Sequence, residues 1–246
     1  MLVHAGFWGQ SDPDRVIGPM QMTQPKAYIF DVFGTLTDWR TAISREVARV
    51  LPHVDATAFA DAWRGEYQPA MERIRSGDRG YVPLDDIHSE NLGIVLDAFE
   101  ISALDDATHD HLARAWERLD TWPDVLPGLE TLKSKAIIAP CSNGSIALMT
   151  HLARHASLPW DCILGADLAQ DYKPKEAVYM ACCTALRLTP QEVMMVAAHN
   201  DDLKAAKALG LQTGFIPRPL EHGPDQTTDL VPAGDWTRTI SVLSEL

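Results

Sequence analysis

Residues 27–38, which read Ala-Tyr-Ile-Phe-Asp-Val-Phe-Gly-Thr-Leu-Thr-Asp, decide the fold of this chain. A short apolar run ends in Asp31, and a Gly-Thr turn follows closely. This pattern is typical of a buried strand that delivers a carboxylate to the edge of a sheet and then bends away. The position two residues later is Phe33, so Asp31 has no second acid beside it. A lone carboxylate at a strand end is a candidate nucleophile, whereas a pair would be a candidate magnesium site.

Further apolar runs predict more strands of the same sheet. Helical patterns at 145–155, 175–186 and 202–209 separate the later runs. Strands that alternate with helices indicate an α/β fold with a doubly wound parallel sheet, a Rossmann-like core. Ligands bind such sheets at the carboxyl ends of the strands. The predicted strands are residues 27–32, 136–141, 162–165, 193–198 and 212–216.

The gap between the first two strands is too long for a loop. Residues 40–122 carry apolar side chains at helical spacing, such as Phe59, Trp63 and Tyr67. We therefore expect an all-helical cap at 40–122, inserted into a core of residues 26–39 and 123–246. Residues 1–25 lack the basic start and the continuous apolar stretch of a signal peptide, and we expect a loose N-terminal extension there.

Composition narrows the class of protein and its partners. The chain has 246 residues, of which 46% are hydrophobic and 22% charged, as in an ordinary soluble globular protein. No apolar run approaches the roughly 20 residues that span a bilayer, so no membrane partner is expected. The net charge of −13 disfavours nucleic acid as a partner. The four cysteines show no metal-ligand spacing, which favours free thiols and a cytoplasmic location.

Polar side chains occur at four of the predicted strand ends. Because these ends share one edge of the sheet, we expect the side chains to meet in one cleft. In chain order they are Asp31 with Thr35, Ser142 with Asn143, Lys173, and His199 with Asp202.

With these four motifs in this order, the chain resembles the haloacid dehalogenase superfamily and, within it, the L-2-haloacid dehalogenases (type II). The resemblance covers roughly residues 26–240. Magnesium-dependent phosphatases of the superfamily carry acids at two further positions, which here are Phe33 and Ala198. The dehalogenase branch shares both substitutions. The resemblance therefore implies metal-free displacement at carbon, with no metal and no other cofactor.

The resemblance implies a two-step reaction on a small anionic substrate. Asp31 attacks the α-carbon of a short L-2-haloalkanoic acid, haloacetates included, and expels halide. Water near Asp202 then hydrolyses the ester to a 2-hydroxy acid. Two unit charges about 4 Å apart repel by roughly 4 kcal/mol at an effective dielectric near 20. Lys173 matches the catalytic lysine of the family and is expected against Asp31; the alternative is a surface lysine before a turn.

Two arginines are candidates for contacts with halide or substrate carboxylate. Arg64 matches a family arginine that stabilises the departing halide. Such a donor helps because its hydrogen bond to the halide becomes stronger as negative charge develops there. An exposed helix arginine is the alternative. Arg40 is a second candidate for gripping carboxylate or halide, or else a charged residue at a domain junction.

The resemblance assigns supporting roles to further residues. Ser142 would bind the substrate carboxylate or the nucleophile and Asn143 the halide, although Ser-Asn-Gly is also a good helix start. Thr35 would orient Asp31, and Phe33 would lie beside substrate or halide. Tyr179 would support Lys173 or pack in the core.

The last motif departs from the better-known family pattern. His199 stands where the family supplies a polar amide, and it is a candidate donor, base or halide contact, or a hydrogen-bonded structural histidine. Asp201 makes the pocket more polar and leaves the halide range open, fluoride included.

Three other functions stay open from sequence. They are hydrolysis of another small carbon electrophile, a magnesium phosphatase, and a non-catalytic binding protein on the same fold. The resemblance also implies a homodimer.

Overall fold

The computed structural model describes residues 24–102 and 104–246. The predicted extension at residues 1–25 therefore lies almost wholly outside the described residues. Within them a parallel sheet has the strand order β3-β2-β1-β4-β5-β6. Its strands are β1 (Ala27–Phe30), β2 (Ile137–Ser142), β3 (Leu164–Gly165), β4 (Val193–Ala197), β5 (Gln212–Phe215) and β6 (Arg238–Thr239).

The position of β1 in the middle of the sheet fixes where the nucleophile candidate lies. Phe30, the last residue of β1, is paired in register with Pro140 of β2 and with Val196 of β4. Asp31 follows directly, where the strand order runs towards β2 and β3 on one side and towards β4 and β5 on the other. Such a switch point is where open α/β sheets bind their ligands.

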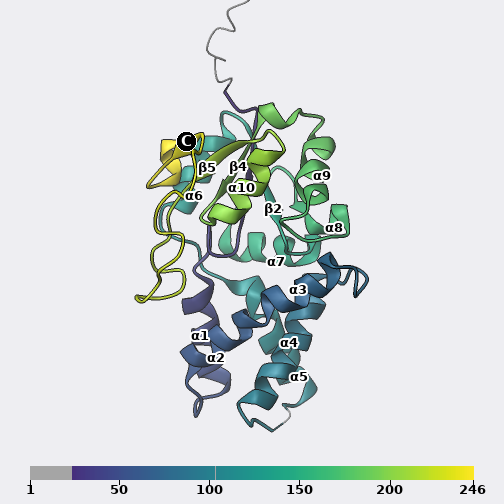
Figure 1. Cartoon of the computed structure of the whole chain (residues 1–246). Coiled ribbons are helices and arrows are strands. Elements are labelled where there is room, and N and C mark those ends of the chain that lie inside the picture. Colours follow the sequence, from purple (N-terminus) through teal and green to yellow (C-terminus); the bar gives the residue numbers. More distant parts are fainter. Residues whose placement is uncertain (1–23, 103) are drawn as a thin grey trace, which may run out of the picture.

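Helices cover both faces of the sheet, which confirms the doubly wound α/β prediction (Figure 1). Tyr28 and Phe30 of β1 belong to one apolar cluster, and Ala27 and Ile29 belong to another. This alternation is the period of two that a strand buried on both faces requires. The helices of the core are α6 (Val125–Lys133), α7 (Ile146–Ala156), α8 (Ala166–Ala169), α9 (Glu176–Leu186) and α10 (Asn200–Ala208), with the short 3-10 turns η2 (Pro190–Glu192) and η3 (Leu243–Glu245).

Between β1 and β2, the helices α1 to α5 with η1 form a helical group at one end of the molecule, whereas α6 lies beside the sheet (Figure 1). Its interior holds the fully buried indoles of Trp39, Trp63 and Trp116. The domain limits at 39/40 and 122/123 stay predictions. The helices are α1 (Trp39–Val50), α2 (Ala56–Gly65), α3 (Tyr67–Arg75), α4 (Leu84–Ala98), α5 (Asp106–Ala113) and η1 (Arg114–Arg118).

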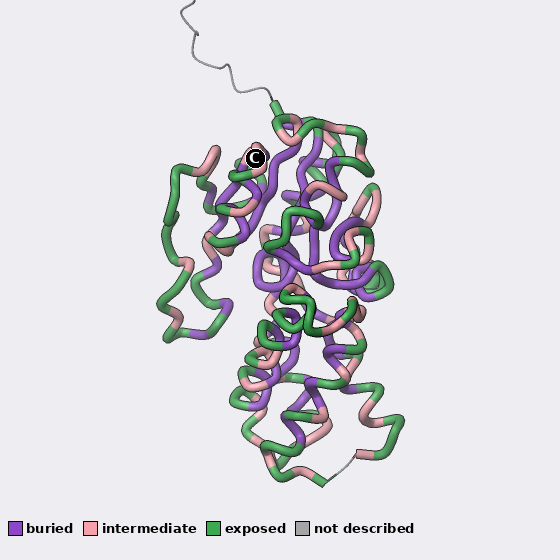
Figure 2. Tube along the Cα trace, turned by 45° about the vertical axis from the view of Figure 1, so that its right-hand side comes forward, coloured by how far each residue is buried: buried purple, intermediate pink, exposed green. Residues whose placement is uncertain are grey.

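The segment 216–237, which joins β5 to β6, runs from the core towards α1 (Figure 1). Arg218 anchors it, since its guanidinium donates to the carbonyl oxygen of Thr35 (2.8 Å) and pairs with Asp124 (2.7 Å). Buried residues run along the strands, whereas exposed residues mark much of this segment (Figure 2).

Among the helices of the described residues, none is long and apolar enough to cross a membrane.

Candidate active site

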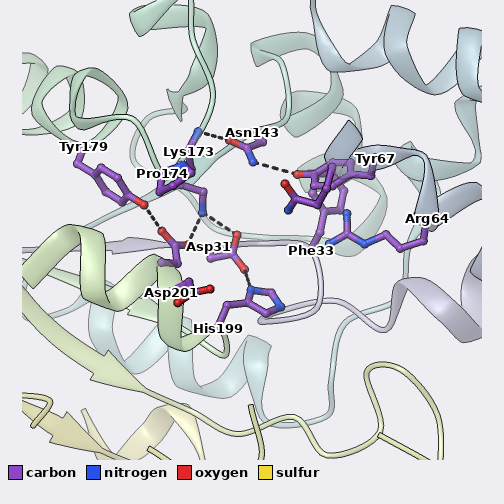
Figure 3. Close-up of a pocket in the computed structure, with 12 residues that line it drawn as sticks. Asp31, Phe33, Arg64, Tyr67, Asn143, Lys173, Pro174, Tyr179, His199 and Asp201 are labelled. Atoms are coloured by element: carbon purple, nitrogen blue, oxygen red, sulfur yellow. Dashed lines mark hydrogen bonds and ion pairs between the residues drawn. The ribbon is translucent and has the colours of Figure 1, made fainter. Parts of the chain in front are cut away.

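Asp31 is held at the end of β1 by three side chains (Figure 3). The Thr35 hydroxyl donates to Asp31 Oδ2 (2.6 Å), and Lys173 Nζ donates to Oδ1 (2.8 Å). His199 Nδ1 lies 3.1 Å from Oδ2. Burial by itself would raise the pKa of Asp31, but Lys173 and His199 outweigh burial and hold this pKa well below its ordinary value. Asp31 is therefore an ionised carboxylate.

Lys173 lies between two carboxylates. Its Nζ also donates to Asp202 Oδ2 (2.6 Å), and its backbone N–H donates to Asn143 Oδ1 (2.9 Å). Burial would lower the pKa of Lys173, yet Asp202 and Asp31 raise it above its ordinary value. Lys173 is thus a fixed ammonium that neutralises the nucleophile.

Both oxygens of Asp202 are bound within the protein. Oδ2 accepts from Lys173, and Oδ1 accepts from the Tyr179 hydroxyl (2.5 Å). Burial raises the pKa of Asp202 despite the nearby ammonium. In this geometry Asp202 orients Lys173 and also lines the pocket, and the expected water beside Asp202 stays a prediction. Tyr179 reaches Lys173 through Asp202 rather than directly.

His199 connects Asp31 to an acid that the motifs did not reveal. Its Nε2 lies 2.9 Å from Glu221 Oε2, on the segment 216–237. Burial would lower the pKa of His199, but Glu221 and Asp31 raise it well above its ordinary value. Burial would raise the pKa of Glu221, which His199 in turn lowers. His199 is therefore an imidazolium between two carboxylates.

Glu221 is fixed by its surroundings. Its side chain is 1% exposed, and Trp39 Nε1 donates to Oε1 (3.2 Å). Gly34 has φ +86°, and a Cβ there would lie 2.0 Å from Glu221 Oε1. Glu221 stands in an irregular segment without a motif. The sequence therefore carries no signal for Glu221 other than Gly34, whose missing side chain leaves space for the Glu221 carboxylate.

The open side of the site is a pocket of about 400 Å³. Asn143 Nδ2 donates to the Tyr67 hydroxyl (3.1 Å), and the Arg64 guanidinium lies 4.0 Å from the centre of the Tyr67 ring. Cap and core residues thus face each other across the nucleophile (Figure 3). The lining residues are Asp31, Phe33, Arg64, Tyr67, Gln68, Asn143, Lys173, Pro174, Tyr179, His199, Asp201 and Asp202.

Three predicted site residues do not line this pocket. Thr35 lies behind Asp31 and accepts from the Ala198 N–H (2.9 Å). Ser142 is fully buried and accepts from the Gly144 N–H (3.0 Å), as in the turn interpretation of its motif. Arg40 lies outside the pocket lining, and its guanidinium donates two hydrogen bonds of 2.7 Å to Asp61.

Comparison with known proteins agrees with this geometry. Residues 25–210 match the family described as haloacid dehalogenase-like hydrolase. The chain is 47% identical to a defluorinating L-2-haloacid dehalogenase of known structure, with a TM-score of 0.88 over 90% of this chain and 93% of that chain. The chain belongs to the L-2-haloacid dehalogenase family.

Two further members of this family match over most of their length. A second L-2-haloacid dehalogenase of known structure is 45% identical, with a TM-score of 0.86 over 89% of this chain and 95% of that chain. The (S)-2-haloacid dehalogenase 4A of Burkholderia cepacia is 29% identical over 84% of this chain and 94% of that protein. The sequence-based recognition of the family is confirmed.

Phe33 and Ala198 occupy the two places where the superfamily's phosphatases carry acids. The Lys173 ammonium lies between the two remaining carboxylates, Asp31 and Asp202. Within residues 24–102 and 104–246, no three His, Cys, Asp or Glu side chains are grouped so that they could hold a metal ion.

Proposed function

We propose that this chain hydrolyses short L-2-haloalkanoic acids, haloacetates included, to 2-hydroxy acids through an ester on Asp31 and without a metal. One observation carries the proposal. Asp31 is ionised, has no second acid at position 33, and faces a pocket whose opposite wall holds the Arg64 guanidinium. A carboxylate in this setting suits attack on carbon rather than coordination of magnesium.

In the first step a carboxylate oxygen of Asp31 forms a bond to the α-carbon. The carbon–halogen bond breaks, and the halide leaves with the bonding electron pair. Lys173 offsets the repulsion between Asp31 and the substrate carboxylate, which would otherwise slow the attack. Arg64 and Asn143 line the pocket, and in this mechanism they would contact the departing halide and the substrate carboxylate.

In the second step His199 becomes the base. Ester formation removes the negative charge of Asp31, which is one of the two charges that hold the second proton on His199. The pKa of His199 falls, and its Nδ1 proton passes to solvent. The neutral ring then accepts a proton from the water that attacks Cγ of Asp31, and Glu221 stabilises the imidazolium. The bond between Cγ and the alkyl oxygen breaks next, and the leaving alkoxide takes this proton from His199 to give the 2-hydroxy acid. The carboxylic acid left on Asp31 returns its proton to His199, which restores the carboxylate and the imidazolium. This role replaces the one expected for Asp202.

The test of the function is halide release from L-2-chloropropionate at mildly alkaline pH with excess EDTA. We expect sustained release that the chelator does not change. No release from folded protein would contradict the proposed function, and release that EDTA abolishes would contradict the metal-free mechanism.

We also propose that fluoride is within the halide range. The support is the 47% identity to a structure described as a defluorinating L-2-haloacid dehalogenase. Fluoride released from fluoroacetate, followed with a fluoride electrode, tests this. A rate no higher than without enzyme would contradict it.

A further inference from the structure

The indole of Trp39 connects the first helix of the cap to the acid that contacts His199. Trp39 is the first residue of α1 and is 1% exposed. Its Nε1 donates to Glu221 Oε1 (3.2 Å), and Glu221 belongs to the segment 216–237, which runs from the core towards α1 (Figure 1). The His199 Nε2 lies 2.9 Å from the other carboxylate oxygen, Oε2. One carboxylate therefore joins a side chain of α1 to the ring beside Asp31.

The buried carboxylate of Glu221 depends on donors from the protein. Its side chain is 1% exposed, so water does not solvate it. Burial would raise the pKa of Glu221, but the charges of His199 and Arg64 outweigh burial. His222 Nε2 lies 3.5 Å from Oε1, yet its ring is half-exposed, and burial lowers its pKa, so that His222 is neutral at alkaline pH. The Trp39 N–H is thus a donor to Glu221 that neither titrates nor exchanges its partner for water.

The charge of Glu221 decides which nitrogen of His199 keeps its proton. After the ester forms, the base needs a free Nδ1, which faces Asp31, and a proton on Nε2, which is hydrogen-bonded to Glu221. If Glu221 took the Nε2 proton instead, it would become a neutral acid, and the ring would keep its proton on Nδ1. That tautomer cannot accept a proton from the water that attacks Asp31. A hydrogen bond to the charged form of a carboxylate lowers its pKa and so disfavours this transfer.

We propose that Trp39 is a positioning residue of the second step, whose N–H keeps Glu221 ionised and thereby holds the reactive tautomer of His199. The proposal rests on the function proposed above, in which His199 is the base. A buried carboxylate fixes the tautomer of the catalytic histidine in the same way in serine hydrolases. The face of the Trp39 indole has a separate contact, because the Arg64 guanidinium lies 5.5 Å from the ring centre. A test must therefore remove the N–H and keep an aromatic ring.

Trp39→Phe removes the N–H and keeps a ring beside Arg64. We expect the alkylated enzyme to form at the wild-type rate and its hydrolysis to slow about tenfold, which is the effect of losing one hydrogen bond to a charged group. Rapid-quench mass spectrometry of the intact protein after addition of L-2-chloropropionate measures both rates. Trp63→Phe is the matched control, because Trp63 is equally buried and its Nε1 donates to the carbonyl oxygen of His88 within the cap (3.0 Å). Equal hydrolysis rates in the two variants would overturn the proposal.

Two further readouts separate this role from a loss of packing. In a Glu221→Gln background, Trp39→Phe should slow hydrolysis by less than about twofold, because the charge that the N–H stabilises is already absent. In Trp39→Phe alone, the acid limb of the hydrolysis rate should move to lower pH, since a less firmly ionised Glu221 raises the pKa of His199 less. Equal slowing in both backgrounds, or an acid limb that stays in place, would show that Trp39 does not act through Glu221.

A replacement of the same shape keeps the test valid if Trp39→Phe does not fold. Benzothienylalanine at position 39 retains the form of tryptophan and has sulfur in place of the N–H. Wild-type hydrolysis in that protein would overturn the role of Trp39 and leave the proposed function standing. If the wild-type chain formed no ester from L-2-chloropropionate, the proposed function would fail, and this role would fail with it.

Discussion

At the scale of single residues, two carboxylates hold a proton on His199, and the reaction removes the charge of one of them. Asp31 and Glu221 lie on opposite sides of the imidazole, within 3.1 Å of its two nitrogens. Alkylation of Asp31 leaves Glu221 alone with the ring. In the mechanism proposed above, the base therefore forms only after the ester exists, so that His199 is a cation during the first step and a base during the second.

The variant His199→Asn separates the two steps. Attack by Asp31 needs Lys173 and continues, whereas ester hydrolysis loses its base and should slow by about 10²–10⁴-fold. Intact-protein mass spectrometry should then show the alkylated enzyme accumulating after addition of L-2-chloropropionate. Glu221→Gln, which keeps the shape and removes the charge, should give a smaller effect in the same direction. Wild-type turnover in His199→Asn would rule out its role as the base.

The raised pKa of His199 also predicts how stability changes with pH. A folded-state pKa above the unfolded value of about 6.5 stabilises the protein below that pH. The contribution is lost as pH rises through the folded-state pKa. The difference in melting temperature between wild type and His199→Asn should therefore shrink as pH rises from about 6.5 upward. Thermal denaturation followed by circular dichroism measures this, and a difference that grows with pH would contradict the ion-pair account.

At the scale of elements, the turn after β1 and the segment 216–237 meet at Gly34. In Gly34→Ala the new Cβ would occupy the space of the Glu221 carboxylate. We expect slow ester hydrolysis, as in Glu221→Gln, together with a loss of about 1 kcal/mol in the free energy of unfolding from the positive φ. Gly77→Ala is the matched control, since Gly77 has the same φ of +86° and nothing within 4 Å of its Cβ position. Equal hydrolysis rates in the two variants would contradict the role of Gly34.

The elements also show how far sequence reasoning reaches. The first five strands were predicted, and the signal is clearest in β1 and β4, because a strand buried on both faces is apolar throughout. β6 was missed because its two residues, Arg238 and Thr239, carry no apolar signal. Asp31, Lys173 and His199 were found since they stand at strand ends in motifs. Glu221 was not, because long-range packing brings it against His199 without any motif.

At the scale of the whole molecule, cap and core are tied together beside the catalytic lysine. Arg75 of α3 donates to the carbonyl oxygen of Lys173 (2.8 Å). The Tyr172 hydroxyl donates to the carbonyl oxygen of Val82 (2.6 Å), and the Tyr81 hydroxyl donates to Asp167 (2.5 Å). These contacts couple the position of the cap to that of Lys173. The homodimer implied by the family stays a prediction.

Tyr81→Phe tests this coupling with a single atom removed. The hydrogen bond to Asp167 joins cap to core and, as a bond to a charged group, contributes about 1.5–3 kcal/mol. We expect a lower free energy of unfolding and a higher KM, because the cap closes less firmly over the substrate. Urea denaturation and steady-state kinetics measure the two effects. Unchanged KM with full stability would show that this contact does not hold the cap.

The most direct test of the central claim, that Asp31 carries the substrate as an ester, is one turnover in heavy-oxygen water. The account predicts heavy oxygen in the Asp31 carboxylate, found by mass spectrometry of its peptide, and an unlabelled hydroxyl in the 2-hydroxy acid. Label in the product hydroxyl with none in Asp31 would mean that water attacks the substrate directly, and would contradict the account.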